Sequence, residues 1–146
     1  MAFNGNFVCN SFKKELFEGV HTFGVGGDQF KIALYNNNAS FNASTTAYTT
    51  VNEVAATGTY TAGGGNLTSL PLDLSSNTVL VDFADISFTG VTFTPFGALI
   101  YHSSVSGNPA AFVLDFGAQS RPLARRSRLF SRRSRLPKRL YDLHKA

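Results

Sequence analysis

The sequence predicts a mainly β fold: a single antiparallel domain, arranged as a sandwich or a barrel, with a short N-terminal helix and an atypical basic C-terminal tail. The chain has 146 residues, which is long enough for one domain with its own core. Its 43% hydrophobic and 15% charged residues exclude a chain that is disordered overall. Many Thr, Asn and Ser residues, with 13 Gly, favour strands and turns over helices.

The one predicted helix covers residues 11–18. Ser11 is of the residue type that caps a helix N-terminus, and Gly19 is placed to end the helix. The expected apolar face consists of Phe12, Leu16 and Phe17. A capping box at Thr50–Glu53 predicts one further helical turn, after a polar stretch at 36–50 that we interpret as a surface loop.

Alternating apolar residues predict strands from residue 29 onward. Residues 29–35 alternate as a half-buried strand does. Thr57–Ala62 and Leu67–Leu74 are expected to form a hairpin around a Gly-rich turn. The other expected strands are Thr78–Phe83, Ile86–Phe88, Val91–Thr94, Ala98–Tyr101 and Ala111–Phe116. The expected core includes Phe30, Ile32, Leu34, Val79, Val81, Phe83, Leu99, Ile100, Val113 and Leu114.

The chemistry-bearing residues form no recognisable catalytic or metal-binding motif. The histidines lack a second ligand at metal-binding spacing, so we interpret them as structural or surface residues. They are His21, His102 and His144. Asp82 and Asp85 stand where a strand ends, and Asp is a common turn residue. The Gly-rich segment 24–27 precedes a strand, not the helix N-terminus that a phosphate site needs. We therefore expect no enzyme, metal or cofactor.

Cysteine usage and hydropathy indicate the compartment. Cys9 is the only cysteine, which excludes an internal disulfide. The N-terminus lacks a basic region followed by an apolar stretch, and no apolar run approaches the roughly 18 residues of a membrane span. We expect synthesis in a reducing cytoplasm and no membrane partner.

Charge divides the chain in two. Residues 1–117 contain three Lys and eight acidic residues, a net charge of −5, whereas residues 118–146 contain ten Lys or Arg and one Asp, a net charge of +9. We expect a β-rich structural domain at 1–117 and a tail at 118–146 that is disordered or an isolated helix. Cations in such a tail bind nucleic acid by neutralising phosphates, and a basic amphipathic helix binds a membrane or a partner. The candidate nucleic-acid contacts are Arg125, Arg126, Arg128, Arg132, Arg133 and Arg135.

A second interpretation of the tail is a shifted reading frame. Read one base out of register, codons for Arg, Ser, Leu and Pro become mostly Thr, Ser, Ala, Pro and aliphatic codons. The shifted frame permits a Thr-rich sequence around the run FTIIF, which continues the composition of residues 36–117. In that case the body lacks its last strand, and an exposed sheet edge is expected beside Ala111–Phe116. The gene sequence of an independent isolate distinguishes the two interpretations.

Several segments of the body share a pattern with one class of phage protein. They are residues 13–23, 28–40, 45–54, 58–67, 81–88, 97–104 and 111–117, among them KKELFEGVHTF, VDFADISF and GALIYHSS. Across these segments the chain resembles a small virion structural protein of tailed bacteriophages. Members of this class usually have Trp where Phe88 stands, and they continue beyond the DFG at 115–117 with further β sequence. The resemblance implies a component of the head, neck or tail of a particle.

The composition of the body agrees with that expectation. A polar, β-rich, moderately acidic body without catalytic groups is suited to symmetric assembly. We expect a non-enzymatic virion component that is a homo-oligomer and contacts other virion proteins. The alternative is a receptor- or carbohydrate-binding β-module of a phage fibre, which needs exposed aromatic residues. Its candidate residues are Tyr35, Tyr48, Tyr60 and Tyr101.

Overall fold

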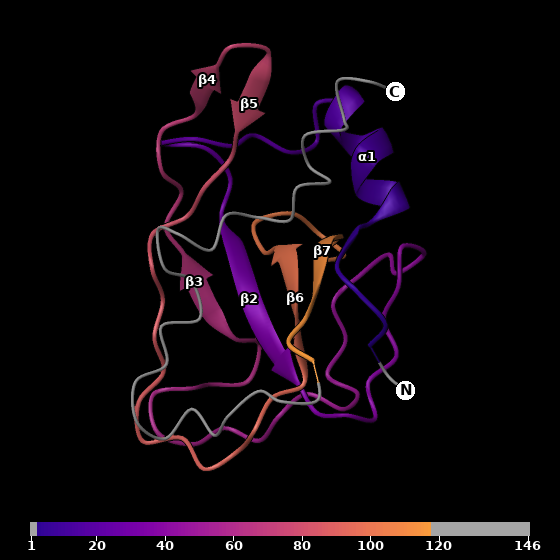
Figure 1. The fold of residues 1–146 in the computed structure, drawn as a ribbon, viewed down its shortest axis with the longest axis vertical. Coiled ribbons are helices and arrows are strands. Elements are labelled where there is room, and N and C mark those ends of the chain that lie inside the picture. Colours follow the sequence, from indigo (N-terminus) through magenta and orange to yellow (C-terminus); the bar gives the residue numbers. More distant parts are fainter. Residues whose placement is uncertain (1–2, 118–146) are drawn as a thin grey trace.

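The computed structural model describes residues 3–117, which form a five-stranded antiparallel sheet, a two-stranded sheet and one helix. The strand order of the large sheet is β1-β7-β6-β2-β3, so the first and last strands are hydrogen-bonded neighbours. Figure 1 shows β7, β6, β2 and β3 in this order across the sheet. Its strands are β1 (Phe7–Val8), β2 (Phe30–Tyr35), β3 (Gly65–Leu67), β6 (Gly97–His102) and β7 (Ala110–Asp115). The small sheet pairs β4 (Asp73–Ser75) with β5 (Thr78–Leu80), and the helix is α1 (Asn10–Phe17).

The prediction of a mainly β, antiparallel fold with a short N-terminal helix is confirmed. The large sheet is open, since β1 forms one edge and β3 the other, and it is not closed as a barrel is. In place of a second large sheet, the described residues form only the β4–β5 hairpin. This hairpin projects from one end of the molecule, at the top of Figure 1.

The start of α1 differs from the expected one. The N-cap is Cys9, without a side-chain cap, because the Cys9 N–H still donates to the Ala111 carbonyl at 2.9 Å and the chain turns into the helix directly afterwards. The predicted cap by Ser11 is therefore wrong. The Ser11 hydroxyl lies within the helix, and it is buried without a hydrogen-bond partner among the described residues. Of the predicted apolar face, Phe12 is buried and Phe17 is 83% exposed.

The end of α1 is the expected one. Gly19 has a φ of +75°, a left-handed conformation that glycine adopts without strain. Its N–H donates to the Leu16 carbonyl, and the Val20 N–H donates to the Glu15 carbonyl. These two bonds close the last turn, as glycine-terminated helices commonly do.

Strand β2 lies between β6 and β3 and is buried on both faces. The alternate residues beginning at Phe30 are buried as predicted, but Ala33 and Tyr35 on the other face are also fully buried. A half-buried strand was therefore the wrong expectation. The polar segment after β2 covers the second face, because the Tyr35 hydroxyl donates to the Thr49 carbonyl and its ring packs against Phe41.

The Gly-rich segment before β3 permits a close backbone approach and does not turn a hairpin. Thr57–Ala62 forms no strand, and Gly65–Leu67 pairs with β2. A Cβ on Gly64 would lie 1.9 Å from the Ile32 carbonyl oxygen, and Gly64 has a φ of +84°. The predicted hairpin is wrong because the glycines bring the chain directly against β2.

The two strands predicted between residues 86 and 94 are also absent. Backbone N–H groups that would donate to a neighbouring strand in a β-ladder donate here to threonine hydroxyl oxygens. The Thr89 N–H donates to Thr59 Oγ1 at 2.8 Å, and the Thr92 N–H donates to Thr57 Oγ1 at 3.4 Å. The apolar residues of this stretch still pack inward, so alternation alone predicted burial correctly and strand pairing wrongly.

Most of the expected core is buried, with two exceptions. Val81 is partly buried, and Val79 is 57% exposed because it belongs to the projecting hairpin. The edge expected beside Ala111–Phe116 is also not bare. Strand β1 pairs there, with Phe7 opposite Val113, and the Asp115 N–H donates to Asn6 Oδ1.

Candidate functional site

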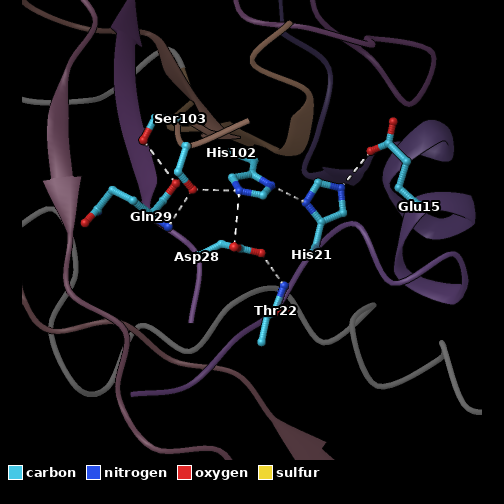
Figure 2. Close-up of polar contacts among 8 residues, drawn as sticks. Glu15, His21, Thr22, Asp28, Gln29, His102 and Ser103 are labelled. Atoms are coloured by element: carbon cyan, nitrogen blue, oxygen red, sulfur yellow. Dashed lines mark hydrogen bonds and ion pairs between the residues drawn. The ribbon is translucent and has the colours of Figure 1, made fainter. Parts of the chain in front are cut away.

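Two buried histidines meet at one end of the large sheet. His102 is the last residue of β6, opposite Phe30 of β2 in the sheet register, and His21 follows the end of α1 by a few residues. They are 81 positions apart in sequence, yet only 2% of His102 and 6% of His21 is exposed. Figure 2 shows the two rings facing each other, with Glu15 of α1 beyond His21.

Short contacts join the groups into one chain. Glu15 Oε2 lies 2.7 Å from His21 Nε2, and His21 Nδ1 lies 2.9 Å from His102 Nδ1. His102 Nε2 lies 2.8 Å from the hydroxyl of Ser104. Asp28 Oδ1 lies 3.7 Å from the same nitrogen. The chain therefore runs from the helix, through both rings, to a loop after β6.

The order of these groups determines where the protons lie. A carboxylate of Glu15 only accepts, so His21 Nε2 carries a proton and donates it. A neutral His21 then has a lone pair on Nδ1, and His102 must donate from its own Nδ1. This leaves the lone pair of His102 on Nε2, which accepts the Ser104 O–H. We assign His21 to the Nε2–H tautomer and His102 to the Nδ1–H tautomer.

The surroundings of His102 favour its neutral form. Burial lowers the pKa of His102 below its usual value, and the neighbouring His21 lowers it further, whereas the carboxylates of Asp28 and Glu15 raise it. The rings lie among aromatic side chains: Phe12 is 4.8 Å from His21 and Phe30 is 5.1 Å from His102, centroid to centroid. The site can hold or pass a proton along the chain. Within residues 3–117, no group of three or more His, Cys, Asp or Glu side chains is arranged to hold a metal ion.

A second cluster gathers around Glu53 on the opposite side of β2. Glu53 Oε2 accepts from the Tyr48 hydroxyl at 2.6 Å, while Oε1 accepts from the Tyr60 hydroxyl and the Gly63 N–H, each at 2.7 Å. The predicted helical turn at Thr50–Glu53 is replaced by a turn that bridges Glu53 to Tyr35. The capping-box prediction is wrong because the Glu53 side chain binds the tyrosines and not a helix terminus.

The tyrosines proposed for carbohydrate binding all belong to this cluster. Tyr35, Tyr60 and Tyr101 are buried, and Tyr48 is partly buried and stacks on Tyr101 with ring centroids 4.5 Å apart. Burial, followed by the Glu53 carboxylate, raises the pKa of Tyr101 to about 12. These rings are parts of the core, so they offer no exposed aromatic platform.

Exposed apolar side chains gather on the projecting hairpin. Leu74 of β4 lies directly opposite Val79 of β5, and the two are 68% and 57% exposed. Leu72, which is 50% exposed, precedes β4 and lies against the 22–28 segment, since a Cβ on Gly24 would be 3.5 Å from its Cγ. An isolated two-stranded hairpin is marginal in water, and this one leaves the apolar side chains of Leu74 and Val79 largely exposed.

Asp82 accepts the N–H of Phe83 at 2.8 Å, and Asp85 is exposed. The Gly-rich segment 24–27 forms a turn, as expected, in which Asp28 Oδ2 accepts the Thr22 N–H. The six tail arginines and the tail itself lie outside the described residues.

Sequence reasoning missed both polar clusters. His102 directly follows the predicted strand Ala98–Tyr101, at the end of the apolar run GALIYH, and a histidine beside such a strand is the one signal that a polar partner is needed. Comparison with protein-family models, curated proteins and solved structures found no match. The one helix among residues 3–117, α1, is not long and apolar enough to cross a membrane.

Proposed function

We propose that the protein is a non-enzymatic component of a bacteriophage particle, acting through protein–protein contacts that include further copies of itself. The observation that supports a protein–protein contact is the exposed Leu74–Val79 pair on the β4–β5 hairpin. The resemblance of the sequence to phage virion proteins supports the proposal that it is part of a particle. The protein needs no metal or cofactor for this role.

The hairpin is suited to association for two reasons. Among residues 3–117 its three-residue strands pair only with each other, so both outer edges keep main-chain groups that a neighbouring strand can bind. Its apolar pair loses contact with water when another surface covers it, which is worth roughly 25 cal/mol for each Å² of apolar area buried. Packing against a neighbour also stabilises a hairpin that is marginal alone.

The self-association is tested with Leu74→Thr/Val79→Thr. Threonine keeps the β-propensity of the strands and removes apolar surface. The matched control is Val51→Thr, because Val51 is 64% exposed and lies in a turn away from the hairpin. Light scattering coupled to gel filtration should show oligomers for the wild type and the control and monomers for the double variant. A wild type that stays monomeric, or a double variant that associates as the wild type does, overturns the self-contact.

Membership of a particle needs its own experiment. Virions purified by density gradient from a culture that expresses the gene should contain the protein in stoichiometric amount, measured by mass spectrometry. Cryo-electron microscopy of the same particles would locate it on the head, neck or tail. Absence from purified particles refutes the virion role, whatever the oligomeric state.

A further inference from the structure

We propose that Glu15, His21 and His102 form a proton-operated clasp that fastens α1 to the large sheet at neutral pH and releases it in acid. Glu15 belongs to α1 and His102 to β6, and His21 joins them with contacts of 2.7 and 2.9 Å. The clasp supplements the apolar contact of Phe12 with Phe112, whose ring centroids are 4.8 Å apart. The proposal does not depend on the virion role.

The proton count explains why acid opens the clasp. The neutral chain has one proton for each contact. A first added proton goes to His102 Nε2, where it faces the Ser104 hydroxyl and Asp28 Oδ1. A proton on His21 Nδ1 is incompatible with the closed clasp, because that nitrogen already accepts from His102. Two N–H groups would then face each other across 2.9 Å on two cationic rings, so the contact must break.

The groups around the rings determine how readily His102 takes up a proton. From α1, Glu15 favours the protonated form of His102, and from the segment before β2, Asp28 does the same. Burial and the other imidazole oppose protonation. Because the pKa of His102 is lowered in the fold, the unfolded or opened state binds the proton more readily. The free energy that closes the clasp is therefore complete above the ordinary histidine pKa of about 6.5 and declines as the pH falls below it.

The first test uses the wild-type protein alone. Long-range ¹H–¹⁵N correlation spectra of the histidine rings at about pH 7 should show His102 as the Nδ1–H tautomer and His21 as the Nε2–H tautomer. The Nδ1–H form is the less common one in solution, so the result is distinctive. His102 in the Nε2–H form would overturn the proposal, because the two ring nitrogens would then not share a proton as assigned.

The second test measures release. Hydrogen exchange of the α1 amides, corrected for the intrinsic pH dependence of exchange, should lose protection by up to about tenfold per pH unit for each proton taken up, between about pH 6.5 and 5. Glu15→Gln keeps the hydrogen bond but removes the charge, and it should move release to higher pH. His102→Phe should flatten the dependence, whereas His144→Gln, outside the described residues, should leave it unchanged. Protection of α1 that does not vary with pH in the wild type overturns the clasp.

Discussion

Replacement of Glu53 by Gln tests whether one carboxylate stabilises the second face of the sheet. Glu53 accepts three hydrogen bonds, from two tyrosine hydroxyls and one backbone N–H, all within 2.6–2.7 Å. The Tyr60 hydroxyl also accepts the Leu34 N–H at 2.9 Å, beyond the end of β3, so the carboxylate supports a bond to β2 indirectly. Gln has nearly the same shape, so the substitution changes charge and acceptor number with little change in packing.

The expected loss in the free energy of unfolding follows from the three hydrogen bonds to Glu53. A hydrogen bond to a charged group contributes about 1.5–3 kcal/mol and a neutral one about 0.5–1.5 kcal/mol, so each bond loses about 1 kcal/mol. Glu53→Gln should therefore lower the free energy of unfolding by about 3 kcal/mol, and the melting temperature by roughly 10–15 °C for a domain of this size. Glu53→Ala should cost more, because it leaves the buried Tyr60 hydroxyl without its acceptor.

Urea unfolding followed by far-ultraviolet circular dichroism measures this difference. The control is Glu18→Gln, since Glu18 is exposed and forms an ion pair with Lys14 at 3.1 Å on the helix surface, a pair worth about 0.3–0.5 kcal/mol. Equal losses for the two variants, or a loss below about 0.5 kcal/mol for Glu53→Gln, would refute the reasoning, because the carboxylate would then not be holding the tyrosines.

Three further outcomes are expected. Gly64→Ala should prevent stable folding, because its Cβ would meet the Ile32 carbonyl at 1.9 Å, whereas Gly26→Ala, at φ +80° in open space, should cost only about 1–2 kcal/mol; equal melting temperatures would contradict this. Burial, then the Glu15 carboxylate, raises the pKa of Cys9 to about 12, so a thiol reagent should label it only after denaturation, and labelling of the native protein would contradict its burial. Burial and Glu53 raise the pKa of the four clustered tyrosines, so stability should fall as the pH rises above about 10, where the unfolded chain loses protons first; in a Tyr141→Phe variant, which keeps only these four, tyrosinate absorbance that rises before unfolding would oppose this.

Local patterns predicted the parts of the fold that local physics decides. The period of two at residues 29–35 located β2, and Gly19 located the end of α1, because each depends on near neighbours in sequence. Burial was predicted well for the same reason. Val79 was the clear exception, since its alternation matches a core strand while its hairpin lies outside the body.

The parts of the fold that the sequence did not predict depend on pairing between residues far apart in the chain. No local signal shows that Gly64 lies on β2 or that Thr59 and Thr57 replace a ladder. The same holds for both polar clusters. His21 and His102 are 81 positions apart, and their meeting depends on how the chain after α1 returns to β6. A sequence shows that a buried histidine needs a partner but does not show which one.

The position of β1 has a consequence for the order of folding. Phe7 pairs with Val113, so one edge of the sheet is completed only when the two ends of the body meet. Long-range closures of this kind slow folding, because the entropy of a large loop is lost before the contact forms. On the ribosome, the N-terminal segment must wait until β7 has emerged, with the apolar side chains of Phe3 and Phe12 still unburied. Nascent chains should therefore depend on chaperones until β7 has emerged, and protease protection of the N-terminal segment should be among the last to develop.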